Sequence, residues 1–86
     1  MSYFVYMLEC NDKTIYTGIA KDVYKRLDEH NNSDKGAKYT KARRPVKLIY
    51  TEVFKDRSSA CKREYEIKQF SRKEKLGLID ENICRW

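Results

Sequence analysis

The sequence has no run of apolar residues long enough to cross a membrane, which takes about 18 consecutive residues. Its longest apolar stretch, Phe4–Leu8, is short and lacks the basic flank of a secretion signal. The sequence also contains no internal repeat and no low-complexity segment. These absences predict a protein without a membrane partner that stays in the cytoplasm.

Nitrogen and sulfur ligands for a metal are also scarce. The chain has three cysteines, Cys10, Cys61 and Cys84, without a C-x-x-C spacing, and one histidine, His30. An odd number of widely spaced cysteines predicts neither a disulfide framework nor a zinc site, and it agrees with reduced thiols in a cytoplasm. Any bound metal is therefore expected to have oxygen ligands.

The length of the chain indicates how many domains it forms, and its charge indicates the kind of partner it binds. Its 86 residues suffice for one domain, so we expect residues 1–86 to form a single domain. Lys and Arg number 19 against 13 Asp and Glu, which gives a net charge of +6. This charge favours an anionic partner, most commonly nucleic acid, although it also serves to keep a small domain in solution.

Apolar segments separated by turn residues predict three strands. We expect strands over residues 2–10, 14–20 and 46–54, with the first two joined in a hairpin by the turn residues Asn11–Lys13. In the third strand, alternation is expected to distribute side chains between two faces: Val46, Leu48 and Tyr50 on one, Ile49 and Val53 on the other.

Capping residues predict three helices. The first is expected to begin at an Asp22 cap and end near residue 32, and the second to run from a cap at Asp56 or Ser58 to about residue 70. Ser71 and Glu74 have capping-box spacing, so a third helix is expected from there to about residue 80.

The element order places this chain in a fold class. The polar, basic segment 33–45 is expected to be a loop. The resulting order, ββαβαα, predicts a small α/β fold in which helices flank a three-stranded antiparallel sheet.

Three ionisable side chains are expected beside the core and not in solvent. Arg26 and His30 are four residues apart and border the apolar face of the first helix. Glu64 lies within the apolar stripe of the second helix, where a carboxylate costs several kcal/mol unless it is paired or binds a metal. Structural alternatives stay open, namely an Arg26 that reaches solvent, a His30 satisfied in the core, and a Glu64 paired with Arg26 or Lys68.

Two tyrosines are expected on one face of the hairpin. Tyr6 and Tyr16 are ten residues apart, so a register that pairs even with even positions places both phenols on one face beside Gly18. Such an arrangement can be simple packing. Together with an arginine, an imidazole and a carboxylate, however, it is a suitable set for phosphodiester cleavage, because a carboxylate can hold Mg²⁺, an arginine can stabilise phosphate charge, and a phenol or imidazole can handle the proton.

Five segments at these residues, in this order, make the sequence resemble the GIY-YIG nuclease domains, and in particular their stand-alone bacterial branch, the YhbQ-like single-domain proteins. The segments are Phe4-Val5-Tyr6, Tyr16-Thr17-Gly18, Arg26–Asn31, Gly36–Thr40 and Glu64–Lys68. They cover about residues 3 to 79. Phe4 and Thr17 depart from the Gly and Ile of the family motifs, at positions of backbone packing more than of chemistry.

The resemblance implies a role for each of these side chains. Tyr6 and Tyr16 would be paired active-site phenols, with Tyr16 as general base or water-orienting group. Arg26 would clamp the phosphate, His30 would help in proton transfer, and Glu64 would be the single protein ligand of one Mg²⁺ or Mn²⁺ ion. The family hydrolyses DNA phosphodiester bonds with the help of a metal.

Nucleic-acid contacts are expected from the basic segment and its neighbours. By resemblance, Lys68, Tyr39 and Thr40 would lie near the scissile phosphate. Cations of the segment would contact the backbone with little reading of bases, unless they merely form a solvated loop. These cations are Lys35, Lys38, Lys41, Arg43, Arg44 and Lys47.

The leading hypothesis is a metal-dependent DNA endonuclease directed by DNA structure more than by sequence, acting in repair or recombination on branched or damaged DNA. A protein partner could supply targeting, because the chain has no second domain. The alternative is a nucleic-acid binding module with weak or no cleavage, whose DNA affinity would not depend on Glu64. A third reading is a partner subunit that docks through its C-terminal residues Cys84–Trp86.

Overall fold

A computed structural model describes residues 2–33 and 38–84 of the chain, with side chains described as far as Ile79. Within this part the order of elements is β1 (Tyr3–Glu9), β2 (Ile15–Ala20), α1 (Val23–Asn32), α2 (Lys38–Lys41), β3 (Lys47–Phe54), α3 (Arg57–Lys68) and α4 (Arg72–Cys84). The strands form one antiparallel sheet, as predicted, and their order in the sheet is β2-β1-β3. In the described part of the chain, no helix has the length and apolar character of a membrane span.

Local interactions at the turn and at the caps explain where the elements begin. In the hairpin turn, the Asp12 carboxylate accepts hydrogen bonds from the backbone N–H and the hydroxyl of Thr14. Asp22 caps α1 by accepting from the backbone N–H of Lys25 at 3.0 Å. Asp56 caps α3 by accepting from the N–H of Ser59 at 2.7 Å. Both helix starts agree with the sequence.

The capping box before α4 is also present, since the Ser71 N–H donates to Glu74 and the Glu74 N–H donates to the Ser71 hydroxyl. The helix it starts extends to Cys84, four residues beyond the expected end near Asp80. The second difference lies in the basic segment, which was expected to be a loop throughout. It contains the short helix α2, whose single turn is too brief to leave a periodic signal in the sequence.

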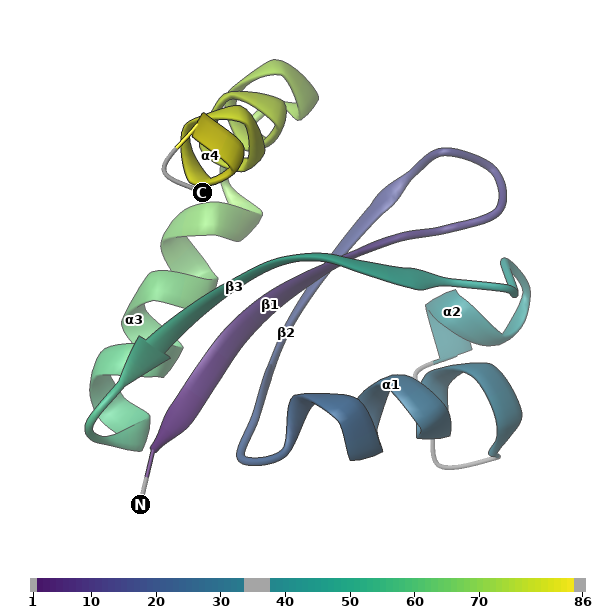
Figure 1. Ribbon diagram of the computed structural model, residues 1–86, viewed down its shortest axis with the longest axis horizontal. Helices are drawn as coiled ribbons and strands as arrows, with labels where there is room; N and C mark the ends of the chain where they lie inside the picture. The colour runs from purple at the N-terminus through teal and green to yellow at the C-terminus, as the bar shows by residue number, and fades with distance from the viewer. Residues whose placement is uncertain (1, 34–37, 85–86) are drawn as a thin grey trace.

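The two faces of the sheet are covered by different helices. Figure 1 shows α3 and α4 on one side and α1 and α2 on the other. The α3 side buries one group of core residues, Val5, Met7, Tyr50, Ala60, Ile67 and Ile79. The α1 side buries a second group, Tyr6, Leu8, Cys10, Val23 and Val46. Alternation along β1 therefore serves both cores.

A β-bulge in β3 contradicts the expected alternation there. Met7 pairs with Tyr50 while Leu8 pairs with Leu48, so Ile49 is an extra residue between two successive pairs. The bulge sends Tyr50 to the α3 side and leaves Leu48 and Val46 on the α1 side. The expectation that these three side chains share a face was wrong, because a bulge shifts the register by one residue.

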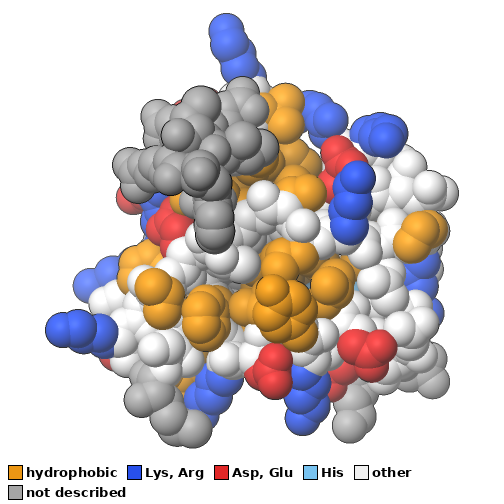
Figure 2. Space-filling view, viewed as in Figure 1, with side chains coloured by type: hydrophobic (Ala, Val, Ile, Leu, Met, Phe, Trp, Pro, Cys, Tyr) orange, Lys and Arg blue, Asp and Glu red, His pale blue; other side chains and the backbone are white. Residues whose placement is uncertain are grey.

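The two edges of the sheet differ in their surroundings. The β3 edge faces the viewer in Figure 1, and Figure 2 shows apolar side chains across the middle of this face. Two apolar residues with large exposed fractions are Val53 at 63% and Tyr24 at 77%. The β2 edge, which includes Tyr16, lies on the opposite side of the sheet.

The structure predicts a stabilising substitution in β2. Thr17 is 3% exposed, and its hydroxyl has no hydrogen-bond partner among the described residues. A buried hydroxyl without a partner costs about 1–3 kcal/mol, so Thr17→Val should raise the free energy of unfolding by about 1 kcal/mol in urea denaturation. The control is Thr51→Val, at an exposed position in β3, which should change it by less than about 0.5 kcal/mol. A loss of stability in Thr17→Val would contradict this interpretation.

Candidate active site

The register of the hairpin brings two phenols to the α1 side of the sheet. Tyr6 pairs with Gly18, and Leu8 pairs with Tyr16, so even positions face even positions as predicted. The ring of Tyr6 lies across Gly18, because a Cβ added at Gly18 would meet the Tyr6 hydroxyl oxygen at 2.5 Å and Cζ at 2.6 Å. A residue without a side chain is therefore required opposite Tyr6.

A chain of buried hydrogen bonds joins three elements of the α1 side. The Tyr6 hydroxyl lies 2.8 Å from Nε2 of His30, and Nδ1 of His30 lies 2.8 Å from the hydroxyl of Thr40. These residues are 1%, 0% and 0% exposed, respectively. Since they belong to β1, α1 and α2, the chain attaches both helices of this side to the central strand.

The protonation states in this chain follow from burial. Burial, aided by the positive charge of Arg26, lowers the pKa of His30 to about 4. Burial, aided by the Tyr16 phenol and opposed by a hydrogen bond from Arg26, raises the pKa of Tyr6 to about 12. Near neutral pH both groups are therefore uncharged, so one ring nitrogen of His30 donates and the other accepts in its hydrogen bonds to Tyr6 and Thr40.

Tyr16 occupies a different position from Tyr6. It is half-buried, its ring centroid is 5.2 Å from that of His30, and it stacks on Tyr39 at 5.9 Å with an interplanar angle of 28°. In the described part of the chain its hydroxyl makes no hydrogen bond. Of the two predicted phenols, Tyr16 is thus the one with a hydroxyl available to a bound molecule.

Arg26 stands at the border of this cluster. Its guanidinium donates to Glu29 at 3.0 Å, with side-chain exposures of 29% for Arg26 and 20% for Glu29, and it also donates to the Tyr6 hydroxyl. Burial opposes its charge, but the hydrogen bonds to Glu29 and Tyr6 outweigh that effect and raise the pKa of Arg26. Glu29 is half-buried, and its carboxylate holds this arginine.

Glu64 approaches the same cluster from α3. Its negative charge contributes to the raised pKa of Tyr6, and its carboxylate lies 3.7 Å from the ammonium of Lys68. The pairing with Lys68 that the sequence left open is therefore present, although the Glu64 side chain remains 21% exposed. Among the described residues, no group of three or more His, Cys, Asp or Glu could hold a metal together.

A single accessible carboxylate nevertheless fits one type of ion. Mg²⁺ and Mn²⁺ prefer oxygen ligands, and Mg²⁺ usually keeps several waters, so one or two carboxylates suffice when a phosphate completes the shell. Glu64 meets this requirement.

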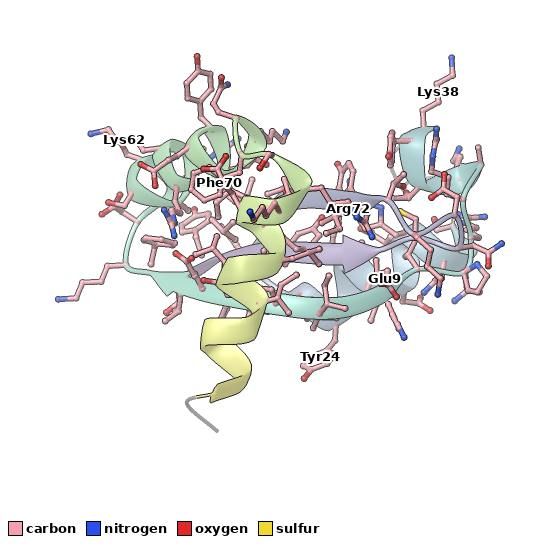
Figure 3. All side chains as sticks on the ribbon, turned by 90° about the horizontal axis from the view of Figure 1, so that it is seen from above. Glu9, Tyr24, Lys38, Lys62, Phe70 and Arg72 are labelled. Carbon is pink, nitrogen blue, oxygen red and sulfur yellow. The ribbon has the colours of Figure 1, made fainter. Side chains whose placement is uncertain are left out.

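The residues predicted to contact nucleic acid separate into two groups. Lys38, Tyr39 and Lys41 are exposed, and Figure 3 shows Lys38 projecting outward from α2. Lys68 is exposed beside Glu64, and Lys47 is exposed with its ammonium 3.6 Å from Glu9.

The other predicted contacts are occupied inside the protein. Thr40 is fully buried against His30. Arg43 bonds to Asp12 at 2.8 Å and lies 3.9 Å above the Tyr39 ring. Arg44 donates to the backbone carbonyls of His30 and Ser33, each at 2.6 Å. Lys35 lies outside the described residues.

Sequence reasoning missed these internal roles. Helix α1 ends without a glycine at its C-terminal cap, and Arg44 satisfies the carbonyls that such a cap would serve. The absence of a glycine at this cap was the sequence signal that another group must satisfy these carbonyls. No comparable signal identified Thr40 as the partner of His30, because the contact joins two separate segments and no local sequence pattern records the distance between them.

Comparison with known proteins gives consistent matches over most of the chain. Residues 2–76 match the family model described as the GIY-YIG catalytic domain. A UPF0213 protein of Staphylococcus saprophyticus is 57% identical over 79 residues, which cover 92% of this chain and 95% of the relative. A UPF0213 protein of Staphylococcus aureus is 55% identical over 80 residues, 93% of this chain and 96% of the relative.

Two solution NMR structures are similar in fold and sequence. The UPF0213 protein BH0048 from Bacillus halodurans has a TM-score of 0.60 and 44% identity, covering 93% of this chain and 84% of the other. The protein EF2693 from E. faecalis has a TM-score of 0.67 and 41% identity, covering 98% of this chain and 88% of the other. The names of these proteins state no activity.

The buried histidine predicts a pH-dependent stability. A pKa of about 4 in the folded state is below the ordinary value of 6.5, so the unfolded chain binds the proton first as the pH falls. Stability should therefore be lost between pH 6.5 and pH 4, by about 2 kcal/mol between pH 7 and pH 5. Denaturation of the wild type and His30→Gln at both pH values isolates this contribution, which the variant lacks. A His30 ring that titrates near pH 6.5 by NMR in the folded protein would refute the prediction, and the single histidine of the chain makes that signal unambiguous.

Replacing either of two glycines with alanine should change the free energy of unfolding, in opposite directions at the two positions. Gly18→Ala forces the Tyr6 ring away from His30, so we expect a loss of about 2–3 kcal/mol in unfolding free energy. Gly77→Ala is the control, since it lies in α4 and its added Cβ would meet nothing within 4 Å. Because alanine favours helices, it should stabilise by up to about 1 kcal/mol. A neutral Gly18→Ala in the same denaturation series would show that the close contact is not constraining.

Proposed function

The chain belongs to the GIY-YIG catalytic domain family, and we propose that it is a metal-dependent endonuclease that hydrolyses DNA phosphodiester bonds. Its substrate class is DNA selected by structure, such as branched or damaged DNA, because the exposed cations near the site suit backbone contacts more than base reading. Repair or recombination is the process in which such a substrate occurs.

One observation carries the proposal: two phenols, an arginine and a carboxylate from four elements meet along the β2 edge. These residues are Tyr6, Tyr16, Arg26 and Glu64. A stable core does not require a carboxylate and an arginine at its border, whereas a site for a phosphodiester needs both a positive clamp and a ligand for a hard cation.

Glu64 would hold the Mg²⁺ or Mn²⁺ ion. When bound, such an ion supplies Lewis-acid stabilisation of charge on the phosphate oxygens. The ammonium of Lys68 neutralises the same carboxylate in the free protein, so it would be displaced from Glu64 toward the phosphate when the ion is bound.

Arg26 and Tyr16 would act directly on the phosphodiester, and Tyr6 would position the arginine. The guanidinium of Arg26 is held by Glu29 in a fixed orientation, which suits it to pair with phosphate oxygens. Tyr16 presents the available hydroxyl and would orient the attacking water or take its proton. Tyr6, held by His30 and Arg26, would fix the position of the arginine.

His30 serves this site as a positioning residue. It is completely buried and uncharged near neutral pH, and both of its ring nitrogens are engaged. Its contribution to proton transfer would therefore pass through the Tyr6 hydroxyl, to which its Nε2 is hydrogen-bonded.

The decisive test is cleavage of a fluorescently labelled forked DNA with Mg²⁺ or Mn²⁺. Glu64→Gln and Arg26→Gln should each lower the cleavage rate by about a hundredfold or more, since each removes charge stabilisation at the phosphate. Glu66→Gln, on the exposed side of the same helix, is the matched control and should cleave normally. Mn²⁺ should also broaden amide signals around Glu64 in the wild type but not in Glu64→Gln.

The outcome separates the two function classes. Metal-dependent cleavage lost in Glu64→Gln supports the endonuclease. DNA binding that is equal in the wild type and Glu64→Gln, without cleavage of forked, nicked or linear DNA, would replace it with the non-cleaving binding module.

A further inference from the structure

A basic groove lies beside the β2 edge, at the end of the strand where Tyr16 lies. It has a volume of about 220 Å³ and is lined by Thr14, Ile15, Tyr39, Arg72 and Lys75. Thr14 and Ile15 come from the hairpin, Tyr39 comes from α2, and the two cations come from the first turn of α4. The groove therefore joins the α1 side and the α4 side of the sheet around the edge of β2, which pairs only with β1 among the described strands.

The groove continues directly from the candidate active site. Tyr39, one of its walls, stacks on Tyr16. On the other wall, Lys75 lies close enough to Lys68 for their charges to interact, and Lys68 in turn contacts Glu64. Lysines and an arginine thus follow Glu64 along the α3 and α4 side of the edge, while Tyr16 and Tyr39 follow Arg26 along the other side.

The charged side chains that line the groove, Arg72 and Lys75, are both positive, which suits an anion. Burial and the nearby charge of Lys68 lower the pKa of Lys75, so bringing these ammonium groups together is unfavourable in the free protein. Arg72 is exposed and donates to the backbone carbonyl of Lys13, which orients its guanidinium at the mouth of the groove. Figure 3 shows Arg72 at the start of α4, projecting toward the strands. Among the side chains that the structure describes, no carboxylate lines this groove.

From this arrangement we infer that Arg72 and Lys75 bind a backbone phosphate of the strand being cut, one or more nucleotides from the scissile bond. The strand lies along the β2 edge, with its reacting phosphate at Arg26 and Glu64 and its neighbouring phosphate between Tyr39 and α4. This inference rests on the proposed nuclease function and adds a binding subsite that the motif residues do not include.

The inference also changes which cations should matter for binding. Arg43 and Arg44 are engaged by Asp12 and by carbonyls at the end of α1, so they are poorly placed to contribute a free charge. Arg72 and Lys75 of α4 take their place, although they lie outside the five segments that resemble the family motifs.

The test measures binding separately from cleavage. Binding of a fluorescein-labelled forked DNA is followed by anisotropy in EDTA at several salt concentrations, with the double variant Arg72→Gln/Lys75→Gln. We expect its affinity to fall about tenfold and the slope of log K against log salt to become shallower by about one, because a phosphate contact is lost.

The matched control removes two positive charges elsewhere. Lys55→Gln/Lys62→Gln changes exposed residues, and Figure 3 shows Lys62 projecting outward from α3 away from Arg72. This control should keep the wild-type slope. The charge-retaining variant Arg72→Lys/Lys75→Arg should also keep most of the affinity, which a purely structural role would not predict. In cleavage assays with Mg²⁺, the Gln variant should raise KM with little change in kcat.

The results distinguish this subsite from the nuclease function itself. If the Gln variant and the control have the same slope while the wild type still cleaves, the subsite is refuted and the nuclease function stands. If the wild type neither binds nor cleaves the forked DNA, both are refuted. A large fall in kcat without a change in KM would also overturn the subsite, since it would place Arg72 or Lys75 at the reacting phosphate.

Discussion

The hydrogen-bonded chain from Tyr6 through His30 to Thr40 is the constraint on which the α1 side of this protein depends. It joins the central strand to α1 and α2 without a charge, because burial keeps the imidazole neutral. A polar chain inside a small core is stable only when every member has a partner. Gly18 is part of the same constraint, since only a residue without a side chain leaves room for the Tyr6 ring.

These buried hydrogen bonds also give the two phenols different roles, since they fix Tyr6 and leave Tyr16 available. Tyr6 is held at its hydroxyl by both His30 and Arg26, so it can orient the arginine but gives up its proton with difficulty. Tyr16, one strand farther out, has the available hydroxyl and stacks on Tyr39. Preorganisation of this type places an arginine and a phenol at a surface without the cost of ordering them when substrate binds.

The edge of β2, which pairs with β1 alone among the described strands, makes this surface accessible. An edge strand exposes backbone groups and is usually protected by neighbouring elements. Here helices from both faces flank the edge without covering it, with Arg26 and Tyr39 on one side and Glu64 and Lys75 on the other. The cations Lys68, Arg72 and Lys75 thus lie around this edge, and the backbone of the proposed DNA strand would match their positive charge.

The sequence by itself determined the three strands, the helices α1, α3 and α4, and the face of the hairpin on which two motif residues lie. Alternation in the hairpin placed Tyr6 and Tyr16 together, and Asp22, Asp56 and Ser71 marked three helix starts, because these signals act within a few residues. Only the tertiary structure decided the bulge at Ile49, the burial of Thr40 on His30, and which cations remain at the surface. Those features depend on distances between segments far apart in the chain, and such distances are set by packing that no local pattern records.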